Sequence, residues 1–165
     1  MPVVSNTSPI LNLAVIGKLS LLHDQFGEIL IPNAVLEELR IQEDLPGSQA
    51  MREALKEEWL RIQEVSDQSL VRILQRELDN GEAAAITLAV QVKAEWILLD
   101  EKEGRKIAKS LGLKVAGILG ILLRARHEGR LPSMQKAMDQ LRDRAGFRIG
   151  AELYADLMRK SGENK

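Results

Sequence analysis

The 165-residue chain contains no cysteine, and this absence removes several classes of chemistry at once. Disulfide bonds, thiolate zinc sites and cysteine nucleophiles are all excluded. Histidine is scarce too, because only His23 and His127 are present, and both lie in polar stretches where we expect surface side chains. The chemistry that remains is acid–base catalysis or the binding of hard metal ions through oxygen.

Aromatic residues and long apolar runs are also few. With two tryptophans, one tyrosine and two phenylalanines, base stacking can contribute little, so nucleic-acid binding would depend mainly on phosphate contacts. No apolar run reaches the roughly 18 residues that cross a membrane, and residues 1–6 do not form a secretion signal. We expect a cytoplasmic protein with no membrane association.

Length and charge set further bounds. A chain of 165 residues can bury one core, so we predict a single domain over residues 1–160 and a frayed tail over 161–165. The 23 basic and 24 acidic residues give a net charge of -1, so any nucleic-acid binding must come from a local basic patch.

Short apolar segments alternate with helical patterns along the chain. Strands are predicted over 3–4, 28–31, 60–65, 96–99 and 114–116. Helices are predicted from Pro9 onward with a break at Gly17, and then over 32–41, within 44–58, and over 67–77, 80–93, 102–111, 118–128, 132–143 and 150–160. This alternation favours an α/β fold whose mainly parallel sheet is covered on both faces.

Polar residues gather at the ends of these strands, where ligands of parallel sheets bind. Asn6 follows the first strand, Asp100 ends the fourth, and Glu82 opens the helix over 80–93. Glu38 flanks the apolar stripe of the helix over 32–41, so we expect it to point inward. Such oxygen donors suit Mg²⁺ or Mn²⁺, which can activate water and offset the charge on a phosphodiester.

Each of these residues also has a purely structural interpretation. Asp79 and Glu82 have the spacing of a capping box, and Asp100 with Glu103 has the same spacing at the next helix. Glu38 could instead form an ion pair with Arg40 or Arg61, and Asn6 could cap a turn.

A basic stripe follows Asp100 at helical spacing, formed by Lys102, Arg105, Lys106 and Lys109. It could hold a phosphate backbone beside the acids. A solvated helix face would show the same pattern.

Several segments together have a familiar order. They are Val3-Val4-Ser5-Asn6-Thr7-Ser8-Pro9, Ile31-Pro32 followed by Val35-Leu36-Glu37-Glu38-Leu39, Leu78-Asp79-Asn80-Gly81-Glu82, Leu98-Leu99-Asp100-Glu101, and Gly112-Leu113-Lys114-Val115-Ala116-Gly117-Ile118-Leu119-Gly120. The set spans roughly residues 2–130 and resembles the PIN-domain superfamily. More narrowly, it resembles small stand-alone prokaryotic PIN-like proteins related to the toxins of VapBC-type toxin–antitoxin modules.

The resemblance implies a three-layer α/β/α sandwich and Mg²⁺- or Mn²⁺-dependent cleavage of RNA. The acids of the family fall on Asn6, Glu38, Glu82 and Asp100, with a supplementary acid at Glu101 or Glu103. The chain departs from the family's pattern at Asn6, whose amide can ligate through its carbonyl oxygen but attracts a dication less than a carboxylate does.

The leading hypothesis is a toxin-type endoribonuclease in which Glu38, Glu82 and Asp100 are catalytic and metal-activated water cuts RNA. The expected substrate-binding residues are Thr7, Ser8, Lys102, Arg105 and Lys106. The runner-up hypothesis is a catalytically weak PIN-like module that binds RNA or a protein. A small-molecule or nucleotide-binding α/β protein, which would also use the strand ends, is a third possibility, but no glycine-rich phosphate loop follows any strand.

The last two predicted helices carry apolar stripes, which are Met134, Ala137, Met138 and Leu141 on one and Ala151, Tyr154, Leu157 and Met158 on the other. Two such stripes exceed what one small core needs. We therefore expect a homodimer or an antitoxin-binding groove here, although the stripes could also pack onto the chain's own core.

Overall fold

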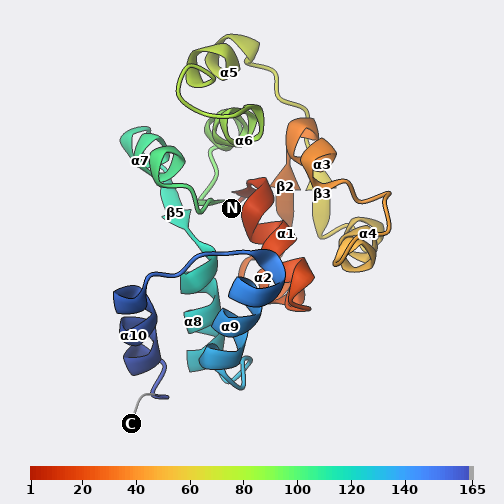
Figure 1. Cartoon of the computed structure of the whole chain (residues 1–165). Helices are drawn as coiled ribbons and strands as arrows, with labels where there is room; N and C mark the ends of the chain where they lie inside the picture. The colour runs from red at the N-terminus through yellow and green to blue at the C-terminus, as the bar shows by residue number, and fades with distance from the viewer. Residues whose placement is uncertain (164–165) are drawn as a thin grey trace.

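A five-stranded parallel sheet forms the centre of the protein (Figure 1). The structure is a computed structural model and describes residues 1–163. The strands are β1 (Val3–Ser5), β2 (Ile29–Ile31), β3 (Leu60–Ile62), β4 (Trp96–Leu98) and β5 (Lys114–Ala116). Their order is β3-β2-β1-β4-β5, and every neighbouring pair is parallel. The central strand β1 is fully buried, as expected for a strand covered on both faces.

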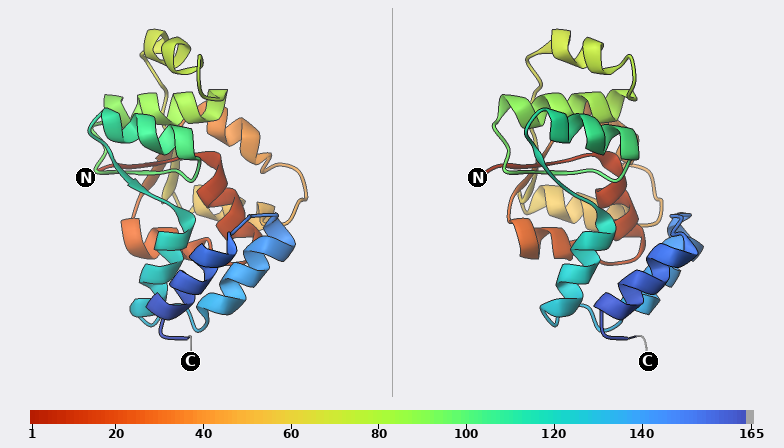
Figure 2. Two further views of the ribbon diagram at one scale, coloured as in Figure 1. Left: turned by 60° about the vertical axis from the view of Figure 1, so that its left-hand side comes forward. Right: turned by 90° about the vertical axis from the view of Figure 1, so that its left-hand side faces the viewer.

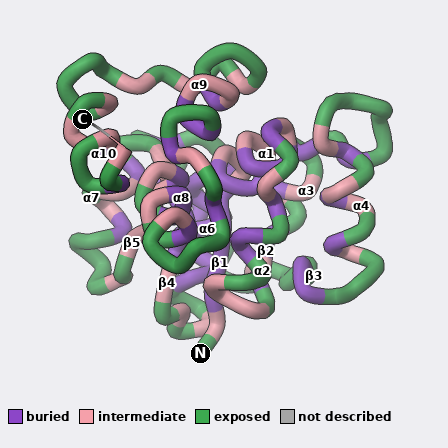
Figure 3. Tube along the Cα trace, turned by 90° about the horizontal axis from the view of Figure 1, so that it is seen from below, coloured by how far each residue is buried: buried purple, intermediate pink, exposed green. Residues whose placement is uncertain are grey.

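Helices cover both faces of this sheet, so the α/β fold with three layers is confirmed. The helices are α1 (Thr7–Val15), α2 (Ser20–Phe26), α3 (Asn33–Leu39), α4 (Ser48–Lys56), α5 (Gln68–Leu74), α6 (Asn80–Gln91), α7 (Lys102–Ser110), α8 (Ile118–His127), α9 (Met134–Ala145) and α10 (Ala151–Lys160). Helices α6 and α7 contact β1, β4 and β5 from one face, and α2 and α4 contact β2 and β3 from the other (Figure 2). The buried residues meet between these layers (Figure 3).

The strand order creates a switch point between β1 and β4. From β1 the chain adds β2 and then β3 on one side, whereas β4 and β5 are added on the other side. At such a point, connections leave neighbouring strands in opposite directions and open a crevice at their carboxyl ends. The residues that follow β1 and β4 therefore come together at one place.

Several predicted boundaries differ from the structure. The first helix begins at Thr7, before the predicted start at Pro9, and β3 ends at Ile62 where we predicted a strand to residue 65. Helix α3 ends at Leu39 because Arg40 adopts a left-handed conformation with φ of 51°. The last two helices begin at Met134 and Ala151, one or two residues later than predicted.

The apolar stripes on the two C-terminal helices differ in how far they are buried. The stripe on α9, Met134, Ala137, Met138 and Leu141, is at most 2% exposed, so it packs in the chain's own core and not in an interface. On α10 only Leu157 is buried. The predicted homodimer or antitoxin groove therefore has no basis on α9.

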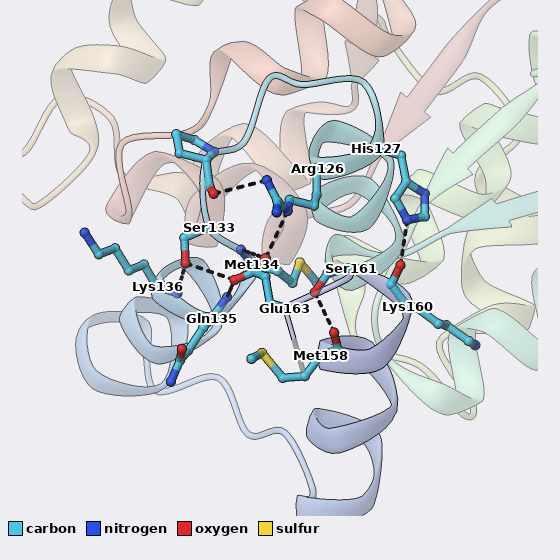
Figure 4. A network of polar contacts seen from close by, with 11 residues as sticks. Arg126, His127, Ser133, Met134, Gln135, Lys136, Met158, Lys160, Ser161 and Glu163 are labelled. Atoms are coloured by element: carbon cyan, nitrogen blue, oxygen red, sulfur yellow. Dashed lines mark hydrogen bonds and ion pairs between the residues drawn. The ribbon is translucent and has the colours of Figure 1, made fainter. Parts of the chain in front are cut away.

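The end of the described chain is tied to α8 and α9 (Figure 4). Ser161 is buried, and the carboxylate of Glu163 accepts hydrogen bonds from the backbone N–H groups of Met134, at 2.7 Å, and Gln135, at 3.2 Å. Arg126 forms an ion pair with the same carboxylate, at 3.1 Å. We predicted a frayed tail over 161–165; residues 161–163 are instead held by these contacts, while 164 and 165 lie outside the described residues.

Both histidines are exposed, as expected, and none of the described helices combines the length and apolar character that crossing a membrane requires.

Candidate active site

Asn6 stands at the centre of the switch point, directly after β1. Its backbone N–H donates to the carbonyl of Leu98 in the neighbouring strand, at 2.9 Å, which fixes the residue at the end of the sheet. The side chain is 4% exposed, and its Oδ1 has no hydrogen-bond partner among the described residues. Asn6 occupies the N-cap position of α1, but its side chain makes no capping hydrogen bond.

Asp100 reaches the same crevice from the end of β4. Its Oδ1 accepts from the backbone N–H of Ile118, at 2.8 Å, and its Oδ2 from the hydroxyl of Ser8, at 3.1 Å. The expected role as N-cap of α7 with Glu103 is wrong, because Glu101 occupies the cap position and Asp100 instead binds the start of α8. Burial raises the pKa of Asp100, while these two hydrogen bonds act in the opposite direction.

Glu82 lies in the first turn of α6 and is 6% exposed. Asp79 caps this helix by accepting from the backbone N–H of Glu82, at 2.8 Å, as predicted. A hydrogen bond from the backbone N–H of Asp79 to the Glu82 carboxylate acts to lower its pKa, while Oε1 of Glu82 is buried without a partner among the described residues. Burial and the neighbouring carboxylates Asp79, Glu101 and Glu38 raise the pKa of Glu82 to about 7.

Glu38 approaches Glu82 from α3. Glu38 is exposed to solvent, but its carboxylate is directed towards α1 and α6, where it accepts a hydrogen bond from the hydroxyl of Thr7, at 2.5 Å, and lies close to Gly81. The ion pair with Arg40 or Arg61 that we considered is not formed, because these arginines pair with Glu43 and Glu28. The interactions of Glu38 therefore face the crevice.

Three glycines that the sequence analysis missed allow these acids to approach the backbone. A Cβ at residue 81 would lie 2.7 Å from Oε2 of Glu38, and one at residue 104 would lie 3.0 Å from Oε1 of Glu82. A Cβ at residue 117 would lie 2.9 Å from Oδ1 of Asp100. Glycine inside a helix costs up to about 1 kcal/mol relative to alanine. Gly81 and Gly104 lie within helices. The presence of this unfavourable residue in a predicted helix was the sequence signal that could have identified them.

A family model described as a PIN domain matches residues 2–163, which is almost the whole chain. The chain belongs to the PIN domain family. No curated protein and no solved structure matches it. A PIN domain is a nuclease-type fold. In this PIN domain, Asn6 and Asp100 follow the neighbouring strands β1 and β4 at the switch point.

Whether this PIN domain can hold a divalent metal depends on its donor atoms. Among residues 1–163, no three aspartate, glutamate or histidine side chains gather closely enough to surround an ion. The chemistry is nevertheless suitable, because Asn6 and Glu82 each leave a buried oxygen without a partner within residues 1–163, at a cost of about 1–3 kcal/mol per group. These oxygens, with the nearby carboxylate of Glu38, fit a hard cation.

The remaining predicted residues surround the crevice without forming one cluster. Glu101 is exposed and, besides burial, its charge raises the pKa of Glu82 and Asp100. Glu103 is exposed in the first turn of α7. The basic stripe is divided, because Lys102, Lys106 and Lys109 are exposed whereas Arg105 is half-buried and donates to the carbonyl of Leu99, at 2.9 Å.

Proposed function

We propose that this PIN domain protein is a metal-dependent endoribonuclease, in which Asn6, Glu38, Glu82 and Asp100 form the site for Mg²⁺ or Mn²⁺. One observation supports the proposal: in a nuclease-type fold, Oδ1 of Asn6, directly after β1, and Oε1 of Glu82, in the first turn of α6, are both buried without a hydrogen-bond partner among the described residues. Glu101 or Glu103 would supply the supplementary acid. When bound, the ion supplies positive charge that lowers the pKa of water and offsets charge on the phosphate.

The chain's own residues would prepare this chemistry. Thr7 and Ser8 each donate to an acid, so they orient Glu38 and Asp100, and direct contact with the substrate stays a prediction. Without metal, burial and the neighbouring carboxylates raise the pKa of Glu82 to about 7, and the charge of a bound cation would favour its ionised, metal-binding form.

The RNA backbone would be bound by charges on α7. Lys102 and Lys106 are exposed and free to meet phosphates, whereas Arg105 would have to exchange its bond to the carbonyl of Leu99 for one to the substrate. Few aromatic residues are available for stacking, which favours recognition through phosphates over recognition through bases.

A second candidate is a PIN-like module that binds RNA or protein and cuts weakly. Two observations favour it. Asn6 supplies an amide where the resemblance implies an acid, and both oxygens of Asp100 already accept hydrogen bonds from the chain itself. Both features lower the attraction for a dication.

Incubation of the purified protein with single-stranded RNA and Mn²⁺ or Mg²⁺ separates the two candidates. If the protein is a nuclease, it should cleave the RNA, and EDTA should abolish the cleavage. Glu82→Gln, and a double variant with Glu38→Gln and Asp100→Asn, should each lose this activity. The matched control is Glu37→Gln, which removes an exposed charge from the same helix as Glu38. RNA binding without cleavage by any of these proteins would refute the nuclease and support the binding module.

The toxin assignment is a further part of the proposal. It predicts a short adjacent reading frame that encodes a small DNA-binding antitoxin, and arrest of growth when this chain is expressed alone. Growth that continues during expression of a protein active on RNA in vitro would refute the toxin role and leave the nuclease intact.

A further inference from the structure

A groove of about 690 Å³ lies along the edge of the sheet, outside the crevice described above. It is bordered by β5, α8 and α10, and it extends to Asp100 at one end. In Figures 1 and 2, α10 stands beside α8 and approaches the sheet at its β5 side. This volume lies within the range of sites that bind ligands or peptide segments.

The walls of the groove are largely apolar. Val115 comes from β5, Ile121 from α8, and Leu153 and Leu157 from α10, while Phe147 lies in the connection between α9 and α10. Leu153 is 46% exposed, so it adds accessible apolar surface to this wall of the groove.

The charges around the groove are mostly positive. Its lining includes Arg105, Arg124, Arg148 and Lys160, and Asp100 is the one acid among the described lining residues. Arg124 and Lys160 pair with Glu128 and Asp156 on their own helices, but such exposed pairs contribute little and can rearrange. An occupant with carboxylates would complement this rim.

One edge of β5 is open to such an occupant. Within residues 1–163, β5 pairs with β4 alone, and the carbonyl of Ala116 accepts from the N–H of Leu99, at 2.9 Å. Because successive residues of a parallel strand direct their backbone groups to opposite sides, the N–H and C=O of Val115 point away from β4. Unpaired backbone groups at a sheet edge are a template for an added strand.

The outer wall of the groove is fixed in place. The end of α10 is attached to α8 through the bond between Nε2 of His127 and the carbonyl of Lys160, at 2.8 Å (Figure 4). Glu163 continues this attachment by accepting from the N–H of Met134 at the start of α9. These contacts hold the C-terminal end of α10 against α8 and α9.

We infer that this groove binds an extended segment of a protein partner in which apolar residues alternate with acidic ones. The segment pairs with the free edge of β5, places its apolar side chains against Leu153 and Leu157, and directs its carboxylates to Arg124 and Arg148. Apolar walls and a free strand edge favour a polypeptide over RNA, which would need phosphate contacts along its whole path. Because the groove ends at Asp100, a bound segment would also obstruct the candidate active site, a consequence that rests on the proposed function.

The test measures fluorescence anisotropy of a labelled peptide of about six alternating valine and glutamate residues, the length of an ordinary strand. It is compared with a peptide in which lysine replaces glutamate, with one methylated on alternate backbone nitrogens, and with oligouridylate RNA. We expect the acidic peptide to bind and the lysine peptide to bind at least about tenfold more weakly. The methylated peptide should also bind more weakly than the acidic peptide, to a similar degree, because it lacks the N–H groups that would pair with β5.

Two variants assign the binding to the groove. Arg148→Glu and Leu153→Glu change exposed side chains, so the fold should persist, and each should weaken the acidic peptide about tenfold or more. Arg76→Glu makes the same charge change as Arg148→Glu outside the groove and should leave binding unchanged.

Equal affinity for the acidic and lysine peptides, or equal loss in the Arg76→Glu control, would overturn the inference. Oligouridylate binding that both groove variants abolish, without peptide binding, would overturn it in favour of RNA. These measurements need no cleavage, so an inactive protein that still binds the peptide would refute the proposed function alone.

Discussion

Replacement of Glu82 by glutamine should flatten the pH dependence of this protein's stability. Burial, together with the charges of Asp79, Glu101 and Glu38, raises the pKa of Glu82 from 4.5 to about 7 in the folded chain. Between these values the folded state binds a proton that the unfolded state has lost, so the free energy of unfolding falls as pH rises. The stabilising contribution of the protonated side chain is complete below pH 4.5 and is lost as pH passes through about 7.

The size of this effect follows from the shift. At about 1.4 kcal/mol per pKa unit, the loss amounts to roughly 3 kcal/mol, or a decrease in melting temperature of roughly 6–12 °C for a chain of this length. Glu82→Gln keeps the shape of the side chain and cannot ionise. The variant should therefore match the wild type at low pH and exceed its stability above neutrality by roughly this amount.

Urea unfolding followed by circular dichroism, from about pH 4 to about pH 8 in EDTA, measures the difference. Glu37→Gln is the matched control, since this exposed glutamate lies on α3 and should leave the curve unchanged. Addition of Mn²⁺ near pH 8 should restore stability to the wild type and not to Glu82→Gln, by roughly 2.7 kcal/mol at a hundredfold excess over Kd. If the wild type and Glu82→Gln lost stability in parallel with rising pH, the reasoning about the buried carboxylate would be wrong.

Three further substitutions, one of them with a matched control, test other parts of the site. Asn6→Asp should tighten Mn²⁺ binding in calorimetry and lower the melting temperature in EDTA, because it adds a negative charge to the acids; unchanged affinity would place residue 6 away from the ion. Gly81→Ala should reduce RNA cleavage by displacing the carboxylate of Glu38. Its control is Gly120→Ala, where no described atom lies within 4 Å of the added Cβ; this change should raise stability by about 0.5–1 kcal/mol and leave cleavage unchanged. Asp79→Ala should cost about 1 kcal/mol in urea unfolding through loss of its bond to the backbone at residue 82, and a cost near zero would contradict its role as a cap.

Local patterns in the sequence predicted the fold well. Most strands are short apolar runs, while β3 alternates apolar and polar residues, and proline or an N-cap residue marks many of the helix starts. The order of elements could therefore be read without tertiary information. Asp79 shows why this works for caps: its partner lies three residues away, within reach of local geometry. The positions of Asn6 and Asp100 at strand ends followed from the general placement of ligands in parallel sheets.

The contacts of the acids could not be predicted in the same way. Asp100 accepts a hydrogen bond from Ile118, which begins α8 after β5, and Glu38 accepts one from Thr7, which begins α1. Both partners are distant in sequence, so only the packed structure selects them over nearer candidates. The groove beside β5 could not be predicted for the same reason, because the side chains of α10 line a groove only when the folded chain places that helix beside the edge strand.

The pairing of β1 with β4 also has a consequence for how the protein folds. Val3 lies opposite Trp96, so the two strands that position Asn6 and Asp100 come together only when a loop of some ninety residues closes. Closing so long a loop is entropically unfavourable until many contacts compensate, whereas β1, β2 and β3 join through shorter connections. We therefore expect the capacity to bind a cation to appear in the last kinetic phase of refolding, which makes Mn²⁺ binding a probe of the completed sheet.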